Sequence, residues 1–245
     1  MVRARERRTG RVWRVRRLSR FIRTEFNTME SNYMKFRYVI WDFDGTLFDT
    51  YPAMIQAFER GLADFGVSVP RARIAALMAN TLAICLETLC REYSLEPEAL
   101  DERVSYYHQQ TTMDQEPPFP GAMQVCERLV AAGGQNFLFT HRSRDSMLRF
   151  MDHYHMAPLF ADCLSVEDGY PRKPDPAGFI ALIEKHHLLR EQGLAVGDRT
   201  LDILAGQGAG VRTCLFNAVP DAEVQPDYVI QTFAELETIL GVVDL

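Results

Sequence analysis

Two kinds of apolar pattern alternate along the chain after residue 35. Short continuous apolar runs predict buried strands of a parallel sheet at 38–42, 136–140, 163–166, 194–197, 211–216 and 228–230. Longer stretches, in which apolar residues recur every three or four positions, predict helices. They cover 53–65, 71–78, 81–93, 97–111, 122–132, 144–153, 176–187, 233–240, and 200 to just before Gly208 or Gly210. The alternation predicts an α/β fold with a Rossmann-like parallel sheet and helices on both of its faces.

The four helical stretches between residues 53 and 116 follow one another without an intervening strand pattern. The proline-rich run 117–121 then interrupts the chain. We therefore expect a small, all-helical domain at 53–116, inserted into an α/β core made of residues 35–52 and 117–245. Residues 1–34 are expected to be a basic, disordered extension.

The first predicted strand ends in two carboxylates, Asp42 and Asp44, followed at once by Gly45 and Thr46. Residues at i and i+2 of an extended segment point to the same side, and unpaired buried carboxylates are costly. The pair therefore fits a bound cation or acid–base chemistry better than simple packing.

Polar residues also end two other predicted strands, Thr140 and Asp198. Open parallel sheets bind their ligands beyond the carboxyl ends of the strands. These two residues and Asp42 are thus expected to meet at one site, and this expectation rests only on their positions at strand ends.

Four motifs make the chain resemble the haloacid dehalogenase-like hydrolases over about residues 38 to 240. In chain order they are Asp42-Phe43-Asp44-Gly45-Thr46-Leu47, Phe139-Thr140-His141, Arg172-Lys173-Pro174-Asp175-Pro176 and Gly197-Asp198-Arg199-Thr200-Leu201-Asp202. The inserted helices resemble the caps that subfamily IA places between its first and second motifs. Within it, the phosphoglycolate phosphatase-like group is the nearest resemblance.

The resemblance implies a role for each matched position. Asp42 would be the nucleophile that forms an aspartyl-phosphate, and Asp44 would protonate the leaving oxygen and then activate water. Thr140 would hydrogen-bond a phosphoryl oxygen. Lys173 would neutralise both the nucleophile and the phosphoryl group.

Mg²⁺ is the cofactor implied, because a hard divalent cation prefers oxygen ligands. By the family pattern Asp42, Asp198 and the backbone carbonyl of Asp44 would bind it directly, and Asp202 directly or through water. Acids favoured by a helix dipole would explain Asp202 alone but not the whole set.

Substrate contacts are expected from the matched loops and from the inserted helices. The expected residues are Gly45, Thr46, Thr81, Thr140, His141 and Lys173, with Tyr51, Gln56 and Asn80 as further candidates by position. For His141, an ordinary exposed histidine is the alternative.

Several activities occur among the haloacid dehalogenase-like hydrolases that the chain resembles. Dehalogenases lack the second aspartate, so Asp44 argues against them. Phosphonate hydrolases of this type need a lysine in the inserted domain, and the chain has none between Lys35 and Lys173. The leading hypothesis is a Mg²⁺-dependent phosphatase for a small phosphate monoester such as phosphoglycolate or a sugar phosphate.

Two alternatives stay open. One is a phosphomutase similar to β-phosphoglucomutase, for which the inserted helices offer arginines to hold a second phosphate: Arg71, Arg73, Arg91 and Arg103. The other is a non-catalytic binding protein on the same fold, against which the intact motifs argue.

Charge and cysteine content limit the partners. The net charge is −6, and residues 1–34 carry ten arginines against three glutamates, a surplus of +7 that leaves −13 on the remainder. So acidic a body would repel nucleic acid, and no apolar stretch is long enough for a membrane span. The five scattered cysteines indicate buried thiols in a reducing compartment, the cytoplasm. We expect a monomer or a weak homodimer.

The basic extension has three interpretations. It is a disordered arm that contacts nucleic acid or acidic lipid, an organellar transit peptide, or a stretch upstream of the true start at Met29 or Met34. We favour the third, because family members place their first strand close to the start.

Overall fold

The computed structural model describes residues 34–243. The expectations for the basic extension lie outside them except at its last residue, Met34, which is buried rather than disordered. One parallel sheet has the strand order β3-β2-β1-β4-β5-β6. The strands are β1 (Tyr38–Trp41), β2 (Gln135–Phe139), β3 (Phe160–Leu164), β4 (Gly193–Gly197), β5 (Arg212–Phe216) and β6 (Tyr228–Ile230). The α/β fold with a parallel sheet is therefore confirmed.

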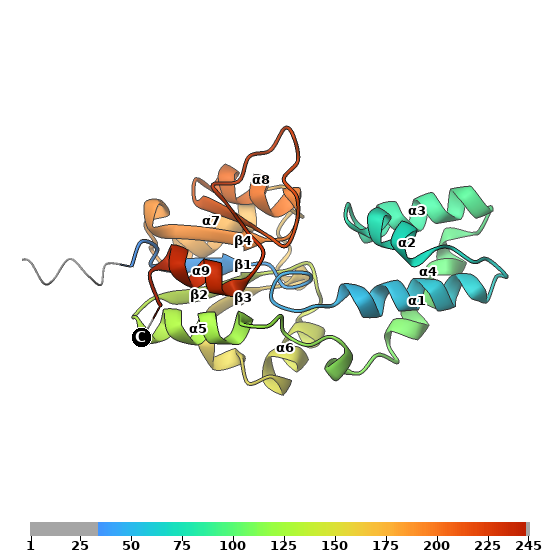
Figure 1. Ribbon diagram of the computed structural model, residues 1–245, viewed down its shortest axis with the longest axis horizontal. Coiled ribbons are helices and arrows are strands. Elements are labelled where there is room, and N and C mark those ends of the chain that lie inside the picture. The colour runs from blue at the N-terminus through green and yellow to red at the C-terminus, as the bar shows by residue number, and fades with distance from the viewer. Residues whose placement is uncertain (1–33, 244–245) are drawn as a thin grey trace, which may run out of the picture. The chain divides into compact units, whose positions relative to one another are not determined.

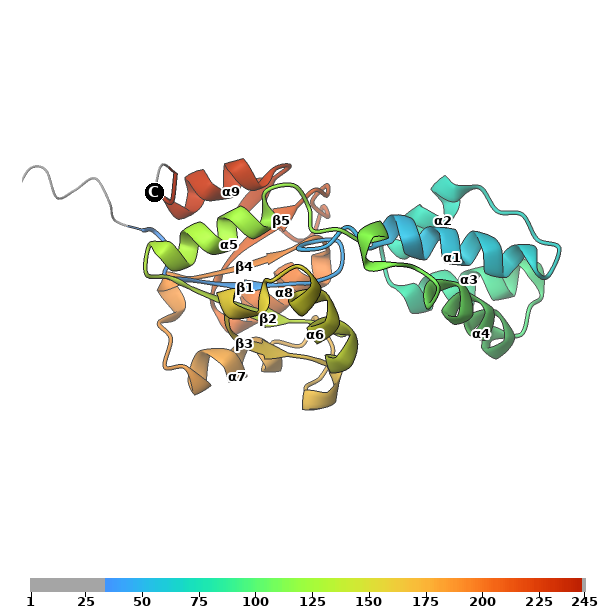
Figure 2. The same cartoon turned by 90° about the horizontal axis from the view of Figure 1, so that it is seen from below.

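Helices cover both faces of the sheet (Figures 1 and 2). The α-helices outside the inserted segment are α5 (Ala122–Ala131), α6 (Arg144–His153), α7 (Ala177–Lys185), α8 (Thr200–Ala209) and α9 (Phe233–Leu240). Val39 and Trp41 of β1 pack with residues of α5, α6 and α9. Tyr38 and Ile40, which alternate with them, pack with residues of α7 and α8. Both faces of β1 are thus buried, which explains its continuous apolar run.

The segment between β1 and α5 forms four α-helices with an apolar cluster of their own. They are α1 (Tyr51–Ala63), α2 (Arg71–Met78), α3 (Leu82–Tyr93) and α4 (Pro97–His108). Pro52 lies in the first turn of α1, where its missing N–H costs nothing. Thr81 begins α3, because its hydroxyl accepts a hydrogen bond from Ile84 N at 3.0 Å.

The two chain connections to these helices run beside each other. Phe119 N donates to Leu47 O at 2.9 Å, and Asp49 N donates to Pro117 O at the same distance. Phe48 and Pro118 form an isolated antiparallel bridge between the two connections. The helical segment is thus joined to the core by two hydrogen-bonded strands of backbone.

Some element boundaries differ from the prediction. Strand β3 begins at Phe160, three residues before the predicted start. The polar Asp162 interrupts the apolar run there, and its carboxylate binds Lys185 Nζ at 2.7 Å and His186 Nε2 at 2.8 Å. Helix α1 begins two residues early, and α4 ends three residues early. The apolar pattern could not predict this start, because it does not show that a charged strand residue is paired by residues distant in the chain.

The predicted lack of a membrane-spanning segment and the predicted free thiols can be compared with the described residues. No helix among residues 34–243 is long and apolar enough to cross a membrane. All five cysteines are free; four are buried, and Cys163 is partly exposed.

Candidate active site

Asp42 follows the last residue of the central strand and lies in the interior. Its backbone N–H donates to Val196 O at 2.9 Å, which extends the β1–β4 pairing to the end of the strand. Only 3% of its surface is exposed. One carboxylate oxygen, Oδ1, accepts from Lys173, whereas the other, Oδ2, is buried without a hydrogen-bond partner among the described residues. Such an orphaned oxygen calls for a ligand.

Lys173 connects two of the predicted acids. Its ammonium donates to Asp42 Oδ1 at 2.6 Å and to Asp202 Oδ1 at 2.8 Å, and 1% of the side chain is exposed. Burial would lower the pKa of Lys173, but the carboxylates of Asp202 and Asp42 outweigh it and raise the pKa. The ammonium is therefore a fixed charge at the carboxyl end of the sheet.

The acids predicted to bind a metal come together. Asp42, Asp198 and Asp202 each offer a carboxylate oxygen, and these oxygens lie within 4.8 Å of one another. Burial, together with the neighbouring carboxylates, raises the pKa of Asp42 to about 6 and that of Asp198 to about 7, against the opposing effect of nearby cations. A divalent cation would relieve this repulsion. The oxygen donors and the orphaned Asp42 oxygen therefore fit a hard divalent cation.

The turn after Asp42 packs closely against the side chain of Asp198. Gly45 has φ +78°, and a Cβ there would come within 2.6 Å of both Asp198 Oδ2 and the Tyr51 ring. Thr46 Oγ1 donates to Asp198 Oδ1 at 3.2 Å, and Tyr51 Oη donates to Asp198 Oδ2 at 2.6 Å. Gly45 and Thr46, predicted to contact substrate, thus lie against Asp198.

The predicted Thr140 and His141 directly follow the last residue of β2. Thr140 is buried at the end of β2, and its Oγ1 accepts from Arg142 N at 3.1 Å, which leaves its hydroxyl proton free to donate. His141 Nε2 accepts from the backbone N–H of Lys173 at 3.1 Å. Burial and the positive charges of Lys173 and Arg172 lower the pKa of His141 to about 4. The imidazole is therefore neutral and helps to hold the Lys173 loop.

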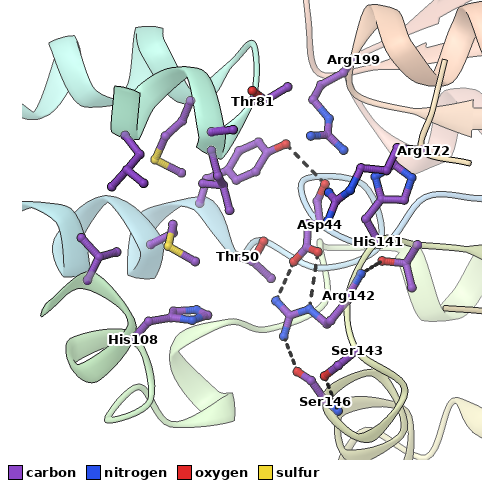
Figure 3. A pocket seen from close by; sticks show the side chains of 18 of the residues that line it. Asp44, Thr50, Thr81, His108, His141, Arg142, Ser143, Ser146, Arg172 and Arg199 are labelled. Carbon is purple, nitrogen blue, oxygen red and sulfur yellow. Dashed lines mark hydrogen bonds and ion pairs between the residues drawn. The ribbon is translucent and has the colours of Figure 1, made fainter. Parts of the chain in front are cut away.

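Two arginines at the site were missed by the sequence reasoning. Arg142 Nη2 donates to Asp44 Oδ1 at 2.6 Å, and its Nη1 donates to Ser146 Oγ at 3.0 Å (Figure 3). Burial would raise the pKa of Asp44, but Arg142 outweighs it and keeps the pKa below its usual value.

Arg199 is the second of these arginines. It lies among the three clustered acids, with Nη2 at 3.8 Å from Asp42 Oδ2 and Nε at 3.9 Å from both Asp198 Oδ1 and Asp202 Oδ2. Its position in the fourth motif, between Asp198 and Asp202, was the available signal.

A pocket of about 770 Å³ opens at these residues. The predicted residues that line it are Asp42, Asp44, Thr81, Thr140, His141 and Lys173. Tyr51 lines it too, whereas Gln56 and Asn80 are exposed residues outside the lining. His108 also lines the pocket, and its Nε2 lies 3.0 Å from Glu116 Oε1.

The sequence pattern of the haloacid dehalogenase-like hydrolases matches residues 39–216, so the chain belongs to this family. It is 27% identical over 219 residues to a phosphoglycolate phosphatase of Vibrio cholerae, covering 84% of this chain and 96% of the relative. It is 24% identical over 217 residues to a pyrophosphatase of Halalkalibacterium halodurans, covering 85% and 99%. A hydrolase structure from Streptococcus pneumoniae superimposes with a TM-score of 0.60 at 27% identity, covering 84% of this chain and 99% of that one.

Proposed function

We propose that the protein is a Mg²⁺-dependent phosphatase that hydrolyses a small phosphate monoester through an aspartyl-phosphate on Asp42. The observation that carries the proposal is the arrangement of the Asp42 carboxylate. One oxygen is fixed by Lys173, and the other is buried, without a hydrogen-bond partner among residues 34–243, beside two further acids. Relatives that bear the names phosphoglycolate phosphatase and pyrophosphatase support phosphate-ester chemistry.

In the first step a carboxylate oxygen of Asp42 attacks phosphorus, and the bond between phosphorus and the alcohol oxygen breaks. Asp44, at the pocket surface, gives its proton to that oxygen. In the second step Asp44 takes a proton from a water that attacks phosphorus, the bond between phosphorus and the Asp42 oxygen breaks, and phosphate leaves. Lys173 and the Thr140 hydroxyl hold the phosphoryl oxygens. Mg²⁺, held by Asp42, Asp198, Asp202 and the carbonyl of Asp44, would screen the repulsion between the phosphate dianion and the carboxylates.

A phosphomutase has less support. Arg71 and Arg73 bind Glu59 and Glu92 on the exposed side of the helices, and neither lines the pocket. Free thiols support the proposal of a cytoplasmic enzyme, and a monomer or weak homodimer stays a prediction.

The test is phosphate release from a panel of small monoesters, with and without Mg²⁺. The wild type is compared with Asp42→Asn, which keeps the shape but removes the nucleophile, and with Asp152→Asn, an exposed acid on α6. We expect turnover that needs Mg²⁺, is lost by at least about a hundredfold in Asp42→Asn, and is unchanged in Asp152→Asn. Equal turnover in wild type and Asp42→Asn would refute the proposal.

A further inference from the structure

The pocket has two chemically different halves. Its core half is lined by charged and polar groups, among them Asp42, Asp44, Arg142, Lys173 and Arg199. Its half from the inserted helices is mainly apolar: Met54, Phe58, Met78, Leu82, Leu86 and Val104. Figure 3 shows the same division, with labelled arginines on the core side and sulfur-bearing and hydrocarbon side chains on the helices opposite.

The arginines of the inserted helices do not supply charge to this pocket. None of the five, Arg60, Arg71, Arg73, Arg91 and Arg103, lines it. Arg71 and Arg73 pair with glutamates, Arg103 Nε binds Asp64 Oδ2 at 2.6 Å, and Arg60 lies over the Tyr107 ring. The polar residues that this segment does add are Tyr51, Thr81, Asp101, Ser105 and His108. Among them Tyr51 Oη donates to Asp198, and His108 Nε2 lies 3.0 Å from Glu116 Oε1.

Most cationic side chains on the core side of the pocket already pair with carboxylates of the protein. Lys173, Arg142 and Arg199 each lie against carboxylates of the site. Arg172 also lines the pocket, and its guanidinium has no hydrogen bond or ion pair with other residues in 34–243. It follows Pro171 in the loop that carries Lys173, so it belongs to the phosphate end of the pocket.

From this division, and resting on the proposed function, we infer that the substrate is a phosphate monoester of a hydrocarbon-rich alcohol, aliphatic or aromatic. A carboxylate or second phosphate in the helix half would lose water without gaining a cation, and would approach Asp101. A volume of about 770 Å³ also exceeds the needs of a two-carbon ester. Leu82 leaves 46% of its surface exposed while lining this half, apolar area that a hydrocarbon group would cover.

The test compares phosphate esters of alcohols with similar leaving-group reactivity: ethanol, n-butanol, n-hexanol and benzyl alcohol, beside phosphoglycolate. We expect kcat/KM to rise by about three- to fourfold per added methylene until the pocket is filled. Phosphoglycolate should be a poorer substrate than the butyl and benzyl esters. A flat alkyl series, or phosphoglycolate as the best substrate, would overturn the inference.

A matched pair of variants locates the effect. Leu82→Gln should lower kcat/KM for hexyl phosphate by about three- to tenfold and leave ethyl phosphate within about twofold. Ile84→Gln, on the same helix with 44% of its surface exposed and outside the pocket lining, should change neither. Leu82→Arg, but not Ile84→Arg, should shift the preference toward phosphoglycolate. Identical effects of the two positions would contradict the inference.

The outcomes separate this inference from the proposed function. If no ester releases phosphate with Mg²⁺, the phosphatase itself is refuted. A second outcome is that all esters are hydrolysed, Asp42→Asn abolishes this hydrolysis, and hydrocarbon length has no effect on kcat/KM. The proposed phosphatase then stands, and only the inferred substrate class is wrong.

Discussion

Arg142 binds Asp44 through two nitrogens, Nη2 at 2.6 Å and Nε at 3.4 Å. Its guanidinium also lies over the rings of Phe43 and Phe150, at 4.9 Å and 4.6 Å from their centroids. In this arrangement Asp44 is an ionised carboxylate. To act as the proposed acid it must take up a proton, so a bound phosphate that draws Arg142 toward itself would make the acid available.

The first prediction concerns the pH dependence of activity. In Arg142→Gln the burial of Asp44 is no longer opposed by its main cation, and only the smaller effects of Thr50 and Arg199 remain, so the pKa of Asp44 rises. The protonated acid then persists to higher pH, and we expect the alkaline fall of kcat/KM to move upward. Phosphate-release assays across pH measure this.

Arg144→Gln is the control for that shift, because Arg144 is an exposed arginine that pairs with Asp168, away from the pocket lining. It should leave the profile unchanged. An alkaline limb that stays in place in Arg142→Gln would show that Arg142 does not govern Asp44.

The second prediction concerns Lys173 and stability. Lys173→Gln leaves Asp42 and Asp202 buried without their shared ammonium, which typically costs about 3–5 kcal/mol of unfolding free energy. Urea unfolding of the metal-free protein measures the loss. Mg²⁺ should restore part of it, because it supplies positive charge to the same acids.

Lys185→Gln is the comparison, since Lys185 pairs with Asp162 through a side chain that is 64% exposed. Exposed pairs contribute about 0–1 kcal/mol. Similar losses in the two variants would mean that the buried ion pairs add no special stability.

The third prediction concerns Arg199 and metal affinity. Its guanidinium lies within 3.9 Å of all three clustered acids, so it lowers the negative potential that attracts a divalent cation. Arg199→Ala should tighten Mg²⁺ binding, on the order of tenfold, and lower the melting temperature without metal. Calorimetric titration with Mg²⁺ and thermal unfolding give both values.

Arg172→Ala serves as the matched control, because that guanidinium lines the same pocket but makes no ion pair with the three acids. It should change Mg²⁺ affinity much less. Weaker Mg²⁺ binding in Arg199→Ala would instead indicate that the arginine supports the metal.

The sequence predicted the site residues that directly follow a strand. Asp42, Thr140 and Asp198 follow apolar runs, so their meeting at one sheet edge needed only the rule for parallel strands. The contacts of Arg142 with Asp44 and of Arg199 with Asp42 could not be found in this way, because long side chains select contacts from distant segments. The apolar lining of the inserted helices was also missed, since an amphipathic pattern does not say which apolar residues stay uncovered.

The last prediction follows from the neutral His141. Its pKa is about 4 in the folded protein, against an ordinary value of 6.5, so the unfolded chain takes up the proton first as the pH falls. Its contribution to stability is therefore complete above about pH 6.5 and is lost as the pH falls toward 4. Protonation would also remove the acceptor for the Lys173 N–H. His141→Gln should flatten this part of the dependence measured by urea unfolding, whereas His153→Gln, an exposed histidine near Asp114, should retain it. An equally steep loss in His141→Gln would assign the acid sensitivity to other groups.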